Sequence, residues 1–345
     1  MDKMIYVTVA AFVAFLLAMI AGRFVIPALH KLKFGQTILE LGPSWHKNKQ
    51  GTPTMGGVMF IGSLVVVLVL FTAVCEWLLP FKPLSGTDDL MHMLRLESGE
   101  RMRLLAGLVM ALCCGAIGFA DDYIKIVKKR NLGLTSSQKM LLQLVVGVGY
   151  ALVMFFMGHA SVIHVPFIGM VDIGWWYLPL CVFFVIGFSN ATNLTDGIDG
   201  LCGSVTVVAT LLITVVSFAL SAYANSLAAM TFVGAIAGFL VWNLHPAKVF
   251  MGDTGSLFIG GMLCALCFAI GRPFLLIPVG VMYIVETLSV MLQVSYFKLT
   301  HGKRLFKMSP IHHHFEMCGW SENKIVTVFC AVTAVVGLLC LPLMI

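Results

Sequence analysis

Charged residues are scarce in this sequence. Only 11% of its 345 residues are Asp, Glu, Lys or Arg, whereas 59% are hydrophobic, and the mean hydropathy is +0.97. Because a soluble domain carries roughly 25% charged residues, this composition excludes a soluble globular protein. We therefore expect an integral membrane protein whose main surroundings are the lipid bilayer, and we expect no nucleic-acid partner.

Long polar stretches are also missing. Ten apolar runs follow one another along the chain, and runs of about 17–25 residues can cross a bilayer as helices. The connections leave no room for a soluble domain, so we expect an all-α polytopic membrane protein in which residues 1–345 form a single domain. The run near 175–190 is short, which leaves the count of ten open by one. The expected spans lie near residues 4–29, 55–79, 102–121, 138–158, 175–190, 200–222, 226–243, 256–271, 274–297 and 323–343.

Little in the chain indicates a cleavable leader or thiol chemistry. The first apolar run is flanked by Lys3 and Arg23 and lacks a small-residue cleavage site, which is typical of a retained span. The ten cysteines lie mostly inside apolar runs. Cys264 and Cys267 form a Cys-x-x-Cys pair within an expected span, where two packed small side chains are favoured over a redox or metal site.

The basic residues are divided unevenly between the two sides of the membrane. The loops that follow odd-numbered spans hold 15 of the 22 Lys and Arg residues, and the other side holds 6. Cytoplasmic loops carry an excess of Lys and Arg. We therefore expect the odd-numbered loops in the cytoplasm and both chain termini outside.

The few acidic residues gather at span ends on that same side. An ionised group near the centre of a membrane helix costs about 2.5–3.5 kcal/mol on insertion scales, and topology alone explains the basic loops but not these acids. The sequence therefore predicts an active-site cleft at the cytoplasmic face. The acids concerned are Asp121, Asp122, Asp196, Asp199 and Asp253.

Asp121 and Asp122 close the third span, with Lys125 within side-chain reach of both. Adjacent helical positions point about 100° apart, so the two carboxylates are expected to do different jobs. The alternative is a solvated helix end that holds the span in register. A helix C-terminus disfavours anions, which favours the functional interpretation.

Two glycine-rich segments between spans could bind a nucleotide or a cation. Asn193–Leu201 holds two Asp-Gly pairs, whose oxygens suit a cation or a ribose, although Asp and Gly are also ordinary turn residues. Met251–Ser256 opens a span with Gly-Asp-Thr-Gly-Ser, which offers free backbone amides to an anion. Asp253 supplies a hard oxygen ligand suited to Mg²⁺, with a simple N-cap as the alternative.

Histidines and two polar residues complete the candidates. His312, His313 and His314 lie in the last basic loop and point in different directions, which makes a poor zinc site and favours binding of a sugar or phosphate. Glu286 lies in the middle of the ninth span, with Gln293 two turns on. These two residues form either a packed polar pair or part of the lining of a cleft.

Taken together, the motifs resemble those of the polyprenyl-phosphate N-acetylhexosamine-1-phosphate transferases. The resemblance runs along essentially the whole chain, and five weak motifs in one order make it specific. The His-His-His-Phe-Glu run is similar to the branch that uses a muramoyl-peptide donor, more than to relatives that use UDP-N-acetylglucosamine. The matching segments are Gly51–Gly57, Gly118–Tyr123, Asn193–Leu201, Phe250–Ser256 and Pro310–Glu316.

The resemblance implies a reaction and a set of partners. UDP-N-acetylmuramoyl-pentapeptide and undecaprenyl phosphate would give lipid I and UMP, with Mg²⁺ as cofactor, in peptidoglycan synthesis at the bacterial cytoplasmic membrane. A homodimer is also implied. Direct attack by the lipid phosphate and a two-step route through a phosphorylated Asp253 both stay open.

The resemblance also implies roles for single residues. Asp253 would bind Mg²⁺, Asp121 would act on the polyprenyl phosphate, and Asp122 would support that site, with either of the latter two also a possible metal ligand. His312 is expected among the catalytic residues, and the phosphates are expected at Lys125 and Lys139. The remaining expected substrate-binding residues are Lys49, Thr54, Asn193, Asp196, Gly197, Ile198, Asp199, Asn243, Phe250, Gln293, His313 and His314.

Three rival functions fit parts of the sequence. A neighbouring enzyme could pass N-acetylglucosamine phosphate to the same lipid. An ion-coupled transporter would also place acids and glycines in membrane helices, but it keeps them near the bilayer midplane and shows internal repeats; here only Glu286 is near the middle of a span. A structural membrane subunit would not need the acidic clusters.

Overall fold

The structure, a computed structural model, describes residues 2–31, 51–73, 98–128, 132–156 and 160–345. Lys49, an expected substrate-binding residue, lies outside these ranges. The helices are α1 (Asp2–Lys31), α2 (Gly57–Ala73), α4 (Ser98–Val127), α5 (Ser136–Phe156), α6 (Tyr177–Thr195), α7 (Leu201–Ala219), α8 (Tyr223–Asn243), α9 (Gly252–Ala269), α10 (Leu276–Val279), α11 (Val281–Leu299), α12 (Ile311–Met317) and α13 (Glu322–Cys340).

The expected all-α membrane fold is confirmed. Within the described residues, eight helices are long and apolar enough to cross a bilayer, and the apolar segment Gly57–Phe71 of α2 is shorter. Strands β1 (Val162–Val165) and β2 (Gly169–Asp172) interrupt the helices of the described chain and form a small antiparallel hairpin, in which Val162 pairs with Asp172 and Val165 with Gly169.

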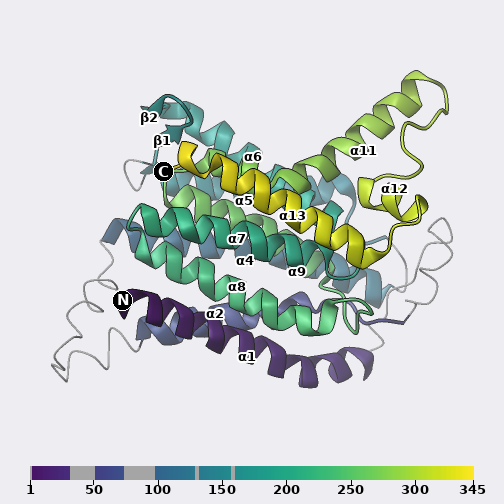
Figure 1. Ribbon diagram of the computed structural model, residues 1–345, viewed down its shortest axis with the longest axis horizontal. Helices are drawn as coiled ribbons and strands as arrows, with labels where there is room; N and C mark the ends of the chain where they lie inside the picture. The colour runs from purple at the N-terminus through teal and green to yellow at the C-terminus, as the bar shows by residue number, and fades with distance from the viewer. Residues whose placement is uncertain (1, 32–50, 74–97, 129–131, 157–159) are drawn as a thin grey trace.

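The ninth expected span is not one straight helix. Pro273–Val279 and Val281–Leu299 meet at an angle of 78°. Pro278 lies in α10 and Gly280 separates the two helices, and helix breaks of this size are usually found at such residues. A side chain at Gly280 would overlap the ring of Phe188, so glycine also allows α6 to pack at the break. Figure 1 shows α11 leaning away from the bundle as a result.

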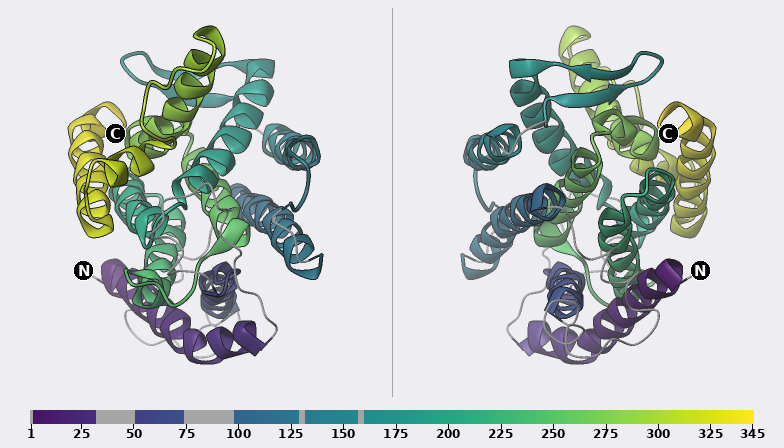
Figure 2. Two further views of the ribbon diagram at one scale, coloured as in Figure 1. Left: turned by 90° about the vertical axis from the view of Figure 1, so that its right-hand side faces the viewer. Right: turned by 90° about the vertical axis from the view of Figure 1, so that its left-hand side faces the viewer.

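Helix α9 forms the centre of the bundle. In its apolar window 83% of the residues are buried, against 22% in α1 and in α13. It packs against both α4 and α6, and Figure 2 shows it enclosed by the surrounding helices. Small residues permit this closeness, since a Cβ at Gly260 would lie 2.5 Å from the Cα of Ser189. Residues at the two ends of α9 are therefore held in fixed positions relative to α4 and α6.

The two ends of the bundle differ in character. The start of α1, the hairpin and the end of α13 lie together at one end, whereas α12 and the start of α13 lie at the other (Figure 1). The hairpin end holds a cavity of about 310 Å³ with an entirely apolar lining, which includes Ile163, Trp176 and Phe274. That cavity offers no group for phosphate chemistry. We call the opposite end of the bundle, where α12 and the start of α13 lie, the polar end.

Gly118 tests the close approach of α4 and α9. A side chain there would overlap the backbone carbonyl of Asp253, so we expect Gly118→Ala to lower the free energy of unfolding by about 1–3 kcal/mol, the usual cost of overpacking. The control is Gly149→Ala on α5, where nothing lies within 4 Å and alanine gains up to about 1 kcal/mol of helix propensity. Unfolding in mild detergent measures both, and equal effects would contradict the packing argument.

Candidate active site

Three carboxylates from two helices meet at the polar end. Asp121 and Asp122 lie near the end of α4, and Asp253 is the second residue of α9. Carboxylate oxygens of all three lie within 4.8 Å of one another. Residues separated by more than 130 positions in sequence thus form one group.

Asp122 serves as a cap for the start of α9. Its oxygens accept hydrogen bonds from the amide of Asp253 (3.3 Å) and from the amide and hydroxyl of Thr254 (3.0 and 2.8 Å). The first amides of a helix have no partner within the helix, and a carboxylate at this end is favoured by the helix dipole. Asp122 therefore fixes Asp253 in place.

The backbone around this cap has room only for glycine. Gly252 has a φ of +71°, a left-handed conformation that side chains rarely adopt. A Cβ there would lie 2.5 Å from Asp122 Oδ2 and 2.7 Å from the hydroxyl oxygen of Thr54. The amide of Phe250 donates to Pro53 (2.8 Å), and its carbonyl accepts from Gly56 (2.8 Å). The start of α2 is thereby tied to the start of α9.

Asp121 has different partners from its neighbour, as the helical spacing predicts. One of its oxygens accepts a hydrogen bond from the amide of Leu134 at 2.8 Å and the other lies 2.6 Å from Lys125 Nζ. Lys139 Nζ is 3.4 Å away. A side chain at Gly133 would overlap the Asp121 carboxylate. The segment before α5 thus closes over this acid.

Asp253 is the most accessible of the three acids. Its side chain is 17% exposed, compared with 1% for Asp121 and 4% for Asp122. One oxygen lies 3.1 Å from Lys125 Nζ and 2.7 Å from Lys139 Nζ, and the other accepts from the amide nitrogen of Asn193 at 2.8 Å. Asp253 is consequently the acid that faces an incoming ligand.

The cluster has the composition of a divalent cation site. Carboxylate oxygens are the ligands that Mg²⁺ prefers. Asp253 and Asp121 are best suited, because Asp122 is needed to cap α9, whereas the other two acids are paired with lysine ammonium groups that a cation can replace. Three carboxylates and two ammonium groups leave one net negative charge, which a divalent cation would reverse to favour an anionic substrate.

The loop of residues 196–200 lies beside these carboxylates. No hydrogen bond to the Asp196 carboxylate occurs among the described residues, and burial, with the charges of Asp253 and Asp122, raises its pKa well above the ordinary value. The amide of Gly200 donates to Asn243 Oδ1 at 3.2 Å, and the Asn243 side-chain nitrogen donates to Val249 at 2.9 Å. The loop is therefore fastened to the segment that leads into α9.

The three histidines have three separate partners, and no contact with the three carboxylates is among those described. His312 is fully buried, and its Nδ1 lies 3.1 Å from the equally buried Glu286. Its Nε2 has no hydrogen-bond partner within the described chain and faces Gly197, where a side chain would overlap the ring. His313 pairs with Glu316 at 2.6 Å, and His314 accepts from the Lys307 amide at 3.1 Å.

Two further expected residues hold backbone segments. The Gln293 carbonyl oxygen accepts from the amides of Leu305 and Phe306 (3.0 and 2.8 Å), so its side chain secures the chain that follows α11. Of the two alternatives for Glu286 and Gln293, a bond between the two side chains is not among the described contacts, and Glu286 pairs with His312 instead. Ile198, in the 196–200 loop, is buried in the hydrophobic core of the protein.

Sequence reasoning missed two residues at this end of the bundle. His245 follows α8, and Glu322 is the first residue of α13; both contact Asp199. Acids are common in the first turn of a helix, so Glu322 looks like an ordinary helix start. The sequence contained no signal that pairs it with a residue 123 positions away.

Comparison with known proteins gives one consistent result. The chain matches the family model of glycosyl transferase family 4 over residues 104–271. It also matches a phospho-N-acetylmuramoyl-pentapeptide-transferase signature over residues 49–61. It is 43% identical to the Listeria monocytogenes (serovar 1/2a) protein of that name over 328 residues, 94% of each chain. It is 42% identical to the Clostridium perfringens (strain 13) protein of the same name over 330 residues, 95% of this chain and 96% of the relative.

A double-mutant cycle tests the cap of α9. Asp122→Ala and Thr254→Val each remove part of the same hydrogen-bonded unit, so we expect them to couple by about 1–2 kcal/mol in the free energy of unfolding. Asp121→Ala combined with Thr254→Val is the control, because no bond between these side chains is among the contacts described for either, and additivity within about 0.5 kcal/mol is expected. Additive effects in the first cycle would refute the capping role.

Proposed function

Since this chain belongs to glycosyl transferase family 4 and to its phospho-N-acetylmuramoyl-pentapeptide transferases, we propose that the cluster of Asp121, Asp122 and Asp253 is where it carries out the transfer. The protein passes phospho-N-acetylmuramoyl-pentapeptide from its UDP-activated form to undecaprenyl phosphate in peptidoglycan synthesis. Lipid I and UMP are the products. The meeting of these acids with two lysines is the observation that carries the assignment.

Asp253 and Asp121 are proposed to hold Mg²⁺. The bound ion would supply positive charge to the diphosphate of the donor, which otherwise repels the phosphate of the lipid. Asp122 is proposed to act indirectly, through the start of α9. Lys125 and Lys139 can leave the carboxylates for phosphate oxygens, because their side chains are 33% and 19% exposed and lie at the accessible edge of the cluster.

Direct transfer in one step is the mechanism we favour. An oxygen of the lipid phosphate attacks the β-phosphorus, and the bond to the bridging oxygen breaks, so that UMP leaves with the electron pair. Phosphoryl transfer depends mostly on positioning and charge stabilisation. A phosphate monoester has a second pKa near 6, so the nucleophile is largely ionised at pH 7, where Asp121 serves mainly to orient it. At lower pH Asp121 also accepts the remaining proton of the lipid phosphate.

The two-step route receives less support from the geometry. In a two-step route Asp253 would be the nucleophile, but one of its oxygens has two ammonium partners and the other accepts a hydrogen bond from the Asn193 side chain. Such partners stabilise a carboxylate as an anion and reduce its reactivity. Asp253 is better suited to ligand binding than to nucleophilic attack.

The nucleotide is proposed to bind along the loop that follows α6. Asn193 and the 196–200 loop adjoin Asp253, and Asn243 holds that loop in place. Thr54, Phe250, Gln293, His313, His314 and Lys49 remain proposed substrate contacts. The fully buried His312 is proposed to support Gly197 from behind.

Orientation and assembly are proposed from the sequence. The excess of Lys and Arg in the odd-numbered loops supports a site facing the cytoplasm. A site at the cytoplasmic edge of the bacterial membrane lets a water-soluble nucleotide and a long-chain lipid each arrive from its own solvent. The homodimer implied by the family stays a prediction.

The donor and the metal are tested together. Purified enzyme with undecaprenyl phosphate should release UMP and form radiolabelled lipid from UDP-N-acetylmuramoyl-pentapeptide, but not from UDP-N-acetylglucosamine. Chelation with EDTA should abolish the reaction and Mg²⁺ should restore it. Lipid product from the second nucleotide sugar would support the rival transferase, and full activity in EDTA would refute the metal.

The division of labour between the acids has a pH signature. Asp121→Asn should lose less rate than Asp253→Asn, because orientation is expected to matter less than metal binding. The loss in Asp121→Asn should also shrink as the pH rises from about 6 to 8, since the lipid phosphate ionises without help above its second pKa. Profiles of kcat for both variants check this, and a loss that is independent of pH would contradict it.

A further inference from the structure

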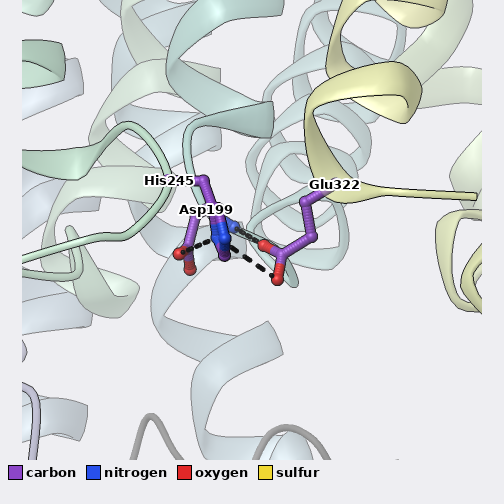
Figure 3. Close-up of side chains that lie close together, drawn as sticks. All are labelled: Asp199, His245 and Glu322. Carbon is purple, nitrogen blue, oxygen red and sulfur yellow. Dashed lines mark hydrogen bonds and ion pairs between the residues drawn. The ribbon is translucent and has the colours of Figure 1, made fainter.

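A second group of polar side chains lies close to the carboxylate cluster but outside it. We call Asp199, His245 and Glu322 the Asp199 cluster; Figure 3 shows the three side chains converging from three parts of the fold. Asp199 belongs to the 196–200 loop, His245 to the segment after α8, and Glu322 to the first turn of α13.

Three of the four contacts of the Asp199 cluster are short enough for hydrogen bonds, and the fourth is a longer ionic contact. The Asp199 carboxylate accepts a hydrogen bond from Ala247 N at 3.0 Å and has His245 Nδ1 at 3.0 Å. Glu322 accepts from the backbone amide of Asp199 at 2.9 Å, and its other oxygen lies 3.6 Å from His245 Nδ1. The side chain of Asp199 is 2% exposed and that of Glu322 is 10% exposed.

The partners determine which nitrogen of His245 carries hydrogen. Carboxylate oxygens only accept hydrogen bonds when ionised, and Nδ1 faces one from Asp199 and one from Glu322. Nδ1 must therefore be the donor. Each of the three residues therefore has a complementary partner within the cluster.

The same atoms argue against a metal at this position. Three ligand atoms lie near enough to one another to hold an ion. The nitrogen concerned, however, is used as a donor toward Asp199, and the Asp199 oxygen also accepts from Ala247. An ion would displace these bonds, so the cluster is better suited to holding chain segments together.

We propose that Glu322 is a positioning residue for the nucleotide donor, acting through Asp199 and His245 on the 196–200 loop. It joins the start of α13 to a backbone amide of that loop. The loop is also bonded to Asn243 through the amide of Gly200, so the contact from α13 adds a second attachment from a different helix. This inference rests on the proposed donor site.

Loss of Glu322 should weaken donor binding and leave the chemical step intact. A hydrogen bond to a charged group is worth enough that its loss changes affinity about tenfold. Glu322→Ala should therefore raise KM for the UDP-linked donor by about tenfold, with kcat and the KM for undecaprenyl phosphate little changed. Glu322→Gln keeps an oxygen for the Asp199 amide and should recover most of the loss.

His245 offers a second pair of variants. His245→Ala removes the donor and should raise the KM of the nucleotide in the same way. His245→Asn places an amide nitrogen near the position of Nδ1 and should bring the KM back toward that of the unmodified enzyme. Asn323→Ala is the matched control, because Asn323 is exposed in the same turn of α13 as Glu322, and it should leave both KM values unchanged.

Hydrogen–deuterium exchange separates this proposal from the donor-site assignment. In full-length enzyme without substrate, Glu322→Ala should speed exchange in peptides that cover residues 196–200, and Asn323→Ala should not. Unchanged exchange would overturn the proposal whatever the kinetics. Faster exchange with an unchanged donor KM would overturn the positioning role and the donor assignment together. A stoichiometric bound transition metal that His245→Asn loses would replace the hydrogen-bonded cluster with a metal site.

Discussion

The contact between the end of α4 and the start of α9 is the constraint on which the rest of the site depends. The Asp122 carboxylate accepts hydrogen bonds from the first amides of α9, and Gly118 lets the backbones of α4 and α9 come into contact. Together they bring Asp253 within reach of Asp121 without any long side chain having to span a gap. Because α9 is also the most buried of the described spans, the surrounding helices resist any relaxation of this geometry.

Electrostatics explains why the acids tolerate one another. Carboxylates within 4.8 Å at the edge of an apolar bundle would repel strongly, since the effective dielectric there is below that of water. Lys125 from α4 and Lys139 from α5 lie between them and offset most of the charge. The segment before α5 also supplies a backbone amide to Asp121. The negative charge of the three carboxylates is thus offset by lysines from two different helices, α4 and α5.

Much of this arrangement could be predicted from the sequence, and the features that could not be predicted have physical explanations. Apolar run length indicated the helices, and counting spans placed Asp121, Asp196 and Asp253 at the same end of the bundle. The break at Gly280 was missed because hydropathy does not register a change of direction. The burial of His312 and the pairing of Glu322 with Asp199 were missed because both depend on tertiary packing between distant segments.

The ion pairs that Lys125 and Lys139 make with Asp253 have a consequence for inhibitors. A compound with several negative charges must break these ion pairs before it can bind the two lysines. Its net affinity is therefore lower than that expected for a site with two unpaired ammonium groups. Its binding also weakens as salt is added, because the charges involved are partly exposed. An uncharged compound that leaves both pairs intact avoids that penalty and depends on shape and neutral hydrogen bonds for its selectivity.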